Sequence, residues 1–384
     1  MLYTYPVLDN HERGVLERID KLRQDLRHFV IQNPKRWTGL LARMTRAKAL
    51  RASNSIENIN VSQEDAIAAV DGEDPADTDR PTWKAVVGYQ EAMTYILQRC
   101  RDRDFRFSVD SILAIHFMIS QSDLDANPGN FRRGWVGVHN TLTKDLVHEG
   151  VDRDFLEPLM NELISYLNIN CDQHIIIKAA LAHLNLTLLH PFSDGNGRTA
   201  RCLQTAVLAN DGIVAQEFSS IEEYIGRNQQ EYYDVLAACG GGGWKPLRDV
   251  RPWIRFCLKG HYVQAQTLLR RNAELGLVYS DLLSLVQGHG LQERMALGLL
   301  EAAFGSRVRN ASYRVSTDVS NNLASRDLKL LTDAGLLIPE GEKRGRHYVA
   351  SPEVFTIRQK HRRPKGIDDP FADNIAEPAE PLLI

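Results

Sequence analysis

The stretch that decides the fold is His190-Pro191-Phe192-Ser193-Asp194-Gly195-Asn196-Gly197-Arg198-Thr199-Ala200-Arg201. It separates two segments with helical patterns, at 172–189 and 198–209. Pro191 disfavours helical geometry at His190, so we expect the first helix to end there. Gly195 and Gly197 permit the unusual dihedrals of a tight turn. This turn opens the second helix, and the first N–H groups of that helix form a cradle for phosphate oxygens.

The polar side chains of the stretch favour phosphate chemistry. Arg198 and Arg201 are three residues apart and share a helix face, and two guanidiniums suit a polyphosphate. Asp194 offers the hard oxygen ligand that Mg²⁺ prefers when it also binds phosphates. His190 is the group that can take a proton near neutral pH. Each residue alone is more often a cap, a turn or a solvated face, so the prediction of phosphoryl or nucleotidyl transfer rests on the combination.

Composition sets broad limits. The chain has 384 residues and a formal net charge of −3, so the chain as a whole makes no case for nucleic acid or membrane binding. No signal peptide and no run of about 18 apolar residues occurs, so we expect no membrane span. The scattered cysteines indicate reduced thiols and a cytoplasmic location. They are Cys100, Cys171, Cys202, Cys239 and Cys257.

The remaining pattern predicts a mainly α protein with two β features. Residues 129–150 carry glycines, turn formers and Trp135, and predict a β-hairpin or flap. Residues 336–350 predict two strands around a charged turn, after three short helical segments. The expected divisions are an N-terminal helical region at 1–104, a core at 105–240, a helical connector at 241–280, a winged helix-turn-helix at 281–355 and a disordered tail at 356–384.

The stretch from His190 to Arg201 resembles the signature of the Fic (Fic/Doc) family, and every specified position is met. The resemblance implies a Fic-type helical core that transfers AMP from ATP to a protein hydroxyl. It makes His190 the general base and Asp194 the Mg²⁺ ligand. It places Gly195, Asn196 and Gly197 in the anion hole, Arg198 on the β-phosphate and Arg201 on the γ-phosphate. Tyr232 and Tyr233 match a paired aromatic near the adenine, although ordinary helix packing explains either one as well.

An upstream motif predicts self-inhibition. Ser53-Asn54-Ser55-Ile56-Glu57-Asn58 fits the family's inhibitory pattern, and Ser53 and Glu57, four apart, share a helix face. By this resemblance Glu57 pairs with Arg201 and occupies the place of the γ-phosphate. An inhibitory helix in the same chain would make an antitoxin partner unnecessary.

Two further surfaces are expected to bind macromolecules. By resemblance, the flap edge at 134–147 takes the target protein as an added strand. The C-terminal pattern resembles the winged helix often appended to Fic cores, with DNA or protein as the candidate partner. Its exposed residues would be Ser320, Asn321, Asn322, Ser325, Arg326 and Lys329 on the helix and Lys343, Arg344 and Arg346 on the wing.

The sequence therefore predicts a protein adenylyltransferase (AMPylase) that is autoinhibited by Glu57 and that modifies other proteins and itself. One alternative is a DNA-binding regulator with a nucleotide-sensing Fic core, and another is an enzyme that removes AMP. The target, the choice of ATP over another nucleotide and a homodimeric state are left open.

Overall fold

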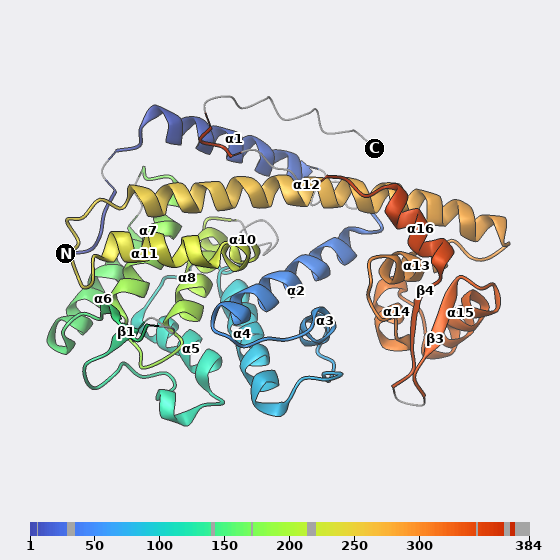
Figure 1. Ribbon diagram of the computed structural model, residues 1–384, viewed down its shortest axis with the longest axis horizontal. Helices are drawn as coiled ribbons and strands as arrows, with labels where there is room; N and C mark the ends of the chain where they lie inside the picture. The colour runs from blue at the N-terminus through green and yellow to red at the C-terminus, as the bar shows by residue number, and fades with distance from the viewer. Residues whose placement is uncertain are drawn as a thin grey trace. The chain divides into compact units, whose positions relative to one another are not determined.

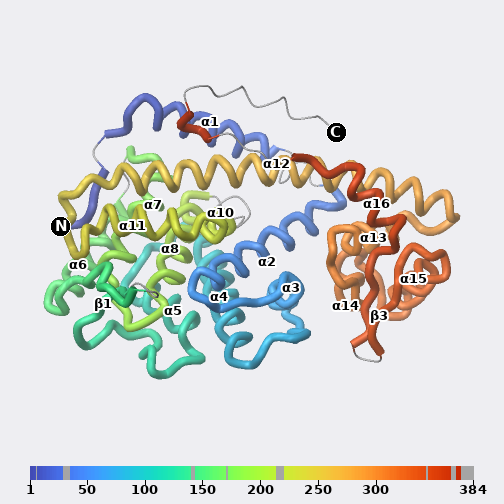
Figure 2. The backbone as a smooth tube through the Cα atoms, viewed as in Figure 1, coloured from blue at the N-terminus to red at the C-terminus, as the bar shows by residue number. Residues whose placement is uncertain are grey.

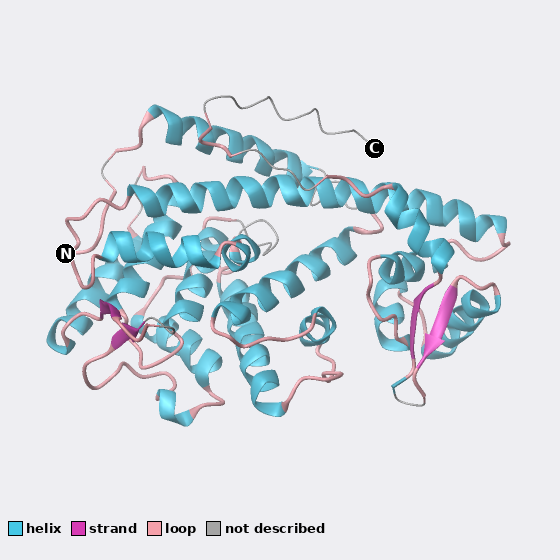
Figure 3. Cartoon of the chain, viewed as in Figure 1, coloured by secondary structure: helices cyan, strands magenta, loops and turns pink. Residues whose placement is uncertain are grey.

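The computed structural model describes residues 1–5, 7–28, 35–139, 143–169, 172–212, 220–342, 345–364 and 369–372. Helices predominate, and the strands of this described part form two small antiparallel hairpins (Figure 3). The expected mainly α class is therefore confirmed. The described residues divide into two compact units, the first from ranges 1–22, 46–264 and 369–373 and the second from ranges 23–45 and 265–368.

Two consecutive helices form the centre of the first unit. They are α7 (Ile175–Leu189) and α8 (Asn196–Asn210), which pack closely on each other. Almost every residue of both helices is buried, which explains why α7 is apolar on all faces. Around them pack α4 (Arg80–Arg99), α5 (Val109–Ser120) and α6 (Arg153–Asn168) (Figure 1).

Local sequence signals begin these surrounding helices. The side chain of Asp79 caps α4 by accepting the N–H of Thr82 at 3.0 Å, and a proline follows in the first turn. Ser108 and Ser111 form a reciprocal capping box at the start of α5. The other elements that lie wholly or partly in this unit are α1 (Asn10–Leu26), α2 (Thr38–Ile56), α3 (Gln63–Asp71), η2 (Leu124–Ala126), α10 (Glu222–Arg227), α11 (Gln229–Gly240) and α12 (Arg251–Gly288).

The predicted flap forms a β-hairpin. Strand β1 (Gly137–His139) pairs antiparallel with β2 (Leu146–Glu149), with Gly137 opposite Glu149 and Val138 opposite His148. The register shifts after Val138, which is typical of a β-bulge. Residues 140–142 of the expected target-binding edge lie outside the described residues.

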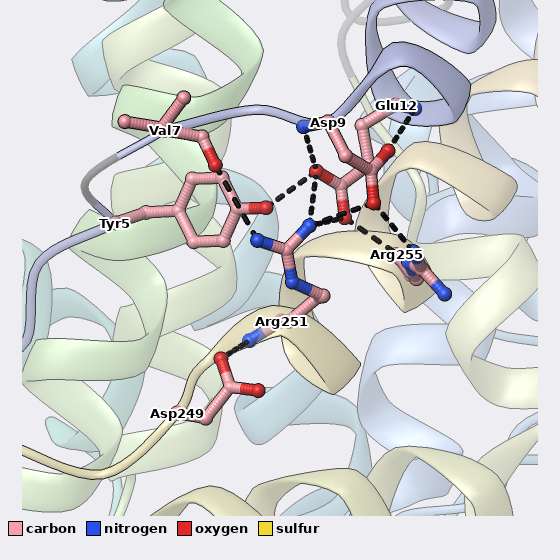
Figure 4. A network of polar contacts seen from close by, with 7 residues as sticks. All are labelled: Tyr5, Val7, Asp9, Glu12, Asp249, Arg251 and Arg255. Carbon is pink, nitrogen blue, oxygen red and sulfur yellow. Dashed lines mark hydrogen bonds and ion pairs between the residues drawn. The ribbon is translucent and has the colours of Figure 1, made fainter.

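A polar network holds the N-terminal segment against the start of α12 (Figure 4). Glu12 is fully buried, and its carboxylate accepts from Arg251 at 2.8 Å and from Arg255 at 3.0 Å. Asp9 binds the same two arginines, at 2.8 and 2.7 Å, and Tyr5 donates its hydroxyl to Glu12. A buried carboxylate is stable only with such partners, so this network fixes the path of the first residues.

The second unit contains three short helices and a hairpin. These are α13 (Met295–Ala303), α14 (Asn310–Thr317), α15 (Asn321–Asp333) and the antiparallel strands β3 (Leu337–Glu340) and β4 (His347–Ala350), followed by α16 (Pro352–Lys360). Asp327 is buried and binds Arg294 at 2.7 and 2.9 Å and the hydroxyl of Tyr313 at 3.0 Å. This contact joins α15 to the residues that precede α13.

The structure departs from the expected divisions in three places. Residues 356–360 were expected to be disordered but belong to α16, because Ser351 caps this helix and Val354 is buried. Helix α12 is unbroken to Gly288, past the expected end of the connector at 280 (Figure 2). Residues 23–45 group with the second unit, where Trp37 packs over Gly276 and donates to Asn272 at 3.0 Å.

Candidate functional site

The loop between α7 and α8 begins where its sequence predicts but is shorter than expected, because α8 starts at Asn196 instead of 198. Helix α7 ends at Leu189, the following His190 has a left-handed φ of 52°, and α8 starts after Gly195, whose φ is 76°. Asn196 closes the loop, because its side chain accepts from the N–H of Phe192 and donates to the carbonyl of Phe192, both at 2.9 Å. The buried ring of Phe192 stacks on His116 with 3.7 Å between centroids. A left-handed φ at a histidine costs energy, because it is not a glycine.

His190 is set up to accept a proton. Its Nδ1 lies 3.2 Å from the carbonyl of Thr187, so Nδ1 carries the hydrogen and Nε2 keeps its lone pair. Burial, with smaller contributions from nearby His148 and Arg132, lowers the pKa of His190 to about 4. The imidazole is therefore neutral at physiological pH, which is the form that a general base requires.

The first turn of α8 presents backbone N–H groups without a side-chain cap. Such a turn attracts anions through its N–H groups and the helix dipole. The anion that lies there in this structure is the carboxylate of Glu57, since a Cβ on Gly197 would collide with Glu57 Oε1. Gly197 is therefore required for the close approach of a negatively charged group.

Arg201 joins this turn to the upstream motif. Its side chain is 1% exposed, and it donates to Ser53 Oγ at 2.8 Å, to the Ser53 carbonyl at 3.0 Å and to Glu57 Oε1 at 2.8 Å. Burial is the largest influence on the pKa of Arg201 and lowers it, but the charge and hydrogen bond of Glu57 together with Tyr232 and Tyr89 outweigh burial, so the pKa is raised. Ser53 and Glu57 thus meet on Arg201, as their spacing suggests.

One detail of the upstream motif differs from the expectation. Helix α2 ends at Ile56, and Glu57 lies in the turn that follows. The N–H of Glu57 bonds to the carbonyl of Asn54 at 3.0 Å, and Asn58 takes a left-handed φ of 61°. This tight ending turns the Glu57 side chain toward Arg201 while the chain leaves the helix.

Asp194 and Arg198 form a second charged pair at the loop. Arg198 Nη2 donates to Asp194 Oδ2 at 3.1 Å, and the two side chains are 6% and 61% exposed. His116 contacts the Asp194 carbonyl at 3.1 Å through its Nε2 and fixes the backbone there. No cluster of three or more potential metal-binding side chains occurs in the described part of the chain. The Asp194 carboxylate lies largely exposed just before the start of α8.

The two tyrosines of the expected adenine pair lie in different surroundings. Tyr232 is 2% exposed, its ring packs on Trp253, and its hydroxyl lies 3.1 Å from His183 Nε2. Tyr233 is 42% exposed and donates to the carbonyl of Ile56, the last residue of α2, at 2.9 Å. Tyr232 is a core residue in this structure, and Tyr233 holds the end of α2.

Three residues near the loop make contacts that the sequence did not predict. Buried Arg132 donates to the carbonyls of His190 at 2.8 Å and Gly134 at 2.6 Å, and also to the carbonyl of Val151. His148 on β2 contacts the Leu188 carbonyl at 2.8 Å through its Nε2. Gln229 donates to the Ile56 carbonyl at 3.1 Å. Arg132 and His148 tie the flap to the end of α7, and no sequence spacing signals such contacts.

Comparison with known proteins agrees with this geometry. Residues 106–208 match the model of the Fic/DOC family. This chain contains a Fic domain. The Fic domain includes α5 to most of α8 and therefore the whole loop from His190 to Arg201.

Curated relatives and solved structures extend the likeness. "Protein adenylyltransferase Fic" of Nematostella vectensis is 30% identical over 175 residues, which cover 44% of this chain and 36% of the relative. The protein of the same name from Aedes aegypti is 31% identical over 176 residues, or 44% and 31% of the two chains. The chain thus spans about a third of the length of these relatives.

The solved structures support the fold alone, because their sequence identities are low. A Fic family protein from Desulfovibrio desulfuricans G20 aligns with a TM-score of 0.59 at 20% identity, over 90% of this chain and 98% of that one. A Fic-1 fragment from Caenorhabditis elegans aligns with a TM-score of 0.52 at 22% identity, over 67% and 72%. In the part of this chain that the structure describes, no helix is long and apolar enough to cross a membrane.

Proposed function

We propose that this protein is a protein adenylyltransferase that transfers AMP from ATP to a protein hydroxyl and is held back by its own Glu57. The proposal rests above all on the neutral His190, the uncapped turn of α8 and the buried Arg201, which one loop and one helix bring together. A base beside an anion cradle with two arginines suits nucleotidyl transfer. The names of the curated relatives agree with this chemistry.

The chemistry follows from the loop. Nε2 of His190 takes the proton of the target hydroxyl, and the hydroxyl oxygen attacks the α-phosphorus. The bond from that phosphorus to the bridging oxygen breaks, and diphosphate leaves with the electron pair. The N–H groups of Gly197 and its neighbours and the guanidinium of Arg198 stabilise the charge of the departing phosphates. Asp194 would hold Mg²⁺, which would neutralise phosphate charge when bound.

Inhibition would arise because Glu57 and the γ-phosphate of ATP compete for the same binding position. Glu57 and a γ-phosphate are both anions that suit Arg201 and the start of α8. With Glu57 in place, ATP lacks its γ-phosphate partner and takes an unproductive pose. Tyr233 and Gln229 support this arrangement, because both hold the carbonyl that precedes Glu57.

The test is transfer of labelled AMP in the presence of Mg²⁺. We expect label on the protein itself and more of it in Glu57→Gly, with none in Glu57→Gly combined with His190→Ala. Label in the histidine variant, or no label in any variant, would contradict the proposal. Release of AMP from previously modified protein, faster in wild type than in Glu57→Gly, would instead support AMP removal as the main role.

DNA binding by the second unit is a separate proposal, supported by the surface of α15. We read α13, α14, α15 and the β3–β4 hairpin as a winged helix. Residues Ser320, Asn321, Asn322, Ser325, Arg326 and Lys329 are all exposed, as is Arg346, whereas Lys343 and Arg344 lie outside the described residues. Asp327 is buried against Arg294 and so does not weaken the positive face. Binding of a mixed DNA library that is lost in Arg326→Ala with Lys329→Ala would support this role; unchanged binding would refute it.

The cytoplasmic location remains a proposal, supported by thiols that are free and buried. These are Cys100, Cys202, Cys239 and Cys257. In protein purified from cells, we expect these thiols to react with an alkylating reagent only after the protein is unfolded.

A further inference from the structure

A cavity of about 530 Å³ opens beside the loop of the Fic domain, and we call it the α4 cavity. Its wall includes Arg80 and Lys84 from the first turns of α4, Ser120 from the end of α5, and Asp194 and Arg198 from the loop. All of these residues belong to the first unit.

Two buried polar groups in the wall of the α4 cavity lack partners. Ser120 is 3% exposed and Arg198 is 5% exposed, and neither Ser120 Oγ nor Arg198 Nε makes a hydrogen bond. Buried donors rarely stay unsatisfied, because each costs about 1–3 kcal/mol. A ligand with several acceptor oxygens in the cavity would satisfy both.

The charge of the α4 cavity favours an anion. Arg80 and Lys84 are exposed, lie one helical turn apart and stand at the N-terminus of a 20-residue helix. With the buried guanidinium of Arg198 they give three cationic side chains against the carboxylates of Asp123 and Asp194. The helix dipole of α4 adds to this positive potential.

The residues around the α4 cavity place it on the side of the loop that we propose holds the phosphates of ATP. Its wall contains Asp194 and Arg198 but neither His190 nor Arg201. It also contains Ile59, two residues beyond the Glu57 carboxylate that lies at the start of α8. The cavity therefore opens from the phosphate side of the loop, away from the base.

We propose that the α4 cavity binds the diphosphate leaving group after AMP transfer. This inference rests on the proposed function. In the transfer step, the oxygen that bridged the α- and β-phosphates leaves with the bonding electron pair and becomes part of diphosphate. The product then moves from the start of α8 toward Arg80 and Lys84, with Arg198 in contact with both places.

The experiment measures binding of inorganic pyrophosphate to the full chain by calorimetry, in the Glu57→Gly background. Adding Arg80→Ala and Lys84→Ala removes two exposed cations, each worth up to about fivefold in affinity, so we expect roughly tenfold weaker binding. Affinity for a non-hydrolysable ATP analogue should change by less than about twofold, since neither residue belongs to the loop that we propose holds the phosphates of ATP. Lys21→Ala with Arg103→Ala is the matched control, because both residues are exposed in the same unit.

Ser120→Ala provides an independent variant. It removes a buried hydroxyl without a partner, so it should weaken pyrophosphate binding without lowering the melting temperature. Unchanged pyrophosphate affinity in both variants would overturn the proposal. Equal weakening of the ATP analogue would also overturn it, because the cavity would then belong to the ATP site. Pyrophosphate binding can be measured without any transfer reaction. If the protein shows no transferase activity but still binds pyrophosphate through Arg80 and Lys84, the binding site in the α4 cavity is supported and the proposed function is rejected.

Discussion

Removal of the Glu57 carboxylate should activate self-modification. Its contact with Arg201 is a charge-assisted hydrogen bond of 2.8 Å between side chains that are 29% and 1% exposed. Such a bond contributes about 1.5–3 kcal/mol. Because about 1.4 kcal/mol is a factor of ten, Glu57→Gly should raise AMP incorporation by roughly 10- to 150-fold.

Further variants separate charge from local structure. Glu57→Gln keeps the size of the side chain and a weaker bond to Arg201, so we expect an intermediate rate. Ser53→Ala should activate less, because the Ser53 carbonyl and Glu57 still hold Arg201. Glu17→Gln is the control for loss of an exposed carboxylate in the same unit.

The assay is a double-mutant cycle on labelled AMP incorporation at fixed ATP and Mg²⁺. Arg201→Ala removes both the inhibitory contact and the proposed γ-phosphate contact, so it should not activate. Adding Glu57→Gly to it should recover little, because two residues that act through one contact are not additive. A wild-type rate in Glu57→Gly, or an equal gain in the Arg201→Ala background, would refute autoinhibition.

Three other predictions follow from the loop. His190 should titrate near pH 4 in an NMR titration, and its signal is the one that disappears in His190→Asn. The transfer rate should fall as the pH drops through that value, because the protonated imidazole cannot act as a base. A titration midpoint at pH 6.5 would contradict the argument that burial lowers the pKa. Asp194→Ala should remove most of the rate and the dependence on Mg²⁺, and an unchanged Mg²⁺ titration would exclude the ligand role. Asn196→Ala breaks two buried hydrogen bonds to Phe192, so the free energy of unfolding should fall by about 2–3 kcal/mol, with an unchanged thermal midpoint as the opposing result.

Local sequence was sufficient where local physics decides the outcome. The end of α7 before Pro191 and the left-handed turn at Gly195 follow from these residue types, whereas α8 begins at Asn196, two residues before the expected start at 198. The flap and the helices of the Fic domain also follow from periodicity and turn residues. The end of the chain was predicted less well, because Ser351 and Pro352 begin a further helix, α16, whose last residues, 356–360, extend into the expected tail.

Long-range contacts needed the tertiary structure. Ser53 and Glu57 could be matched to a motif, but only packing brings them onto Arg201, nearly 150 residues later, and turns Glu57 to the start of α8. The same holds for Tyr232, which packing places in the core, and for Arg132, which binds the end of α7. Sequence by itself determined the loop, since backbone preferences act between neighbours. Which residues contact the loop depends on burial and on charge interactions between segments that only the folded chain brings together.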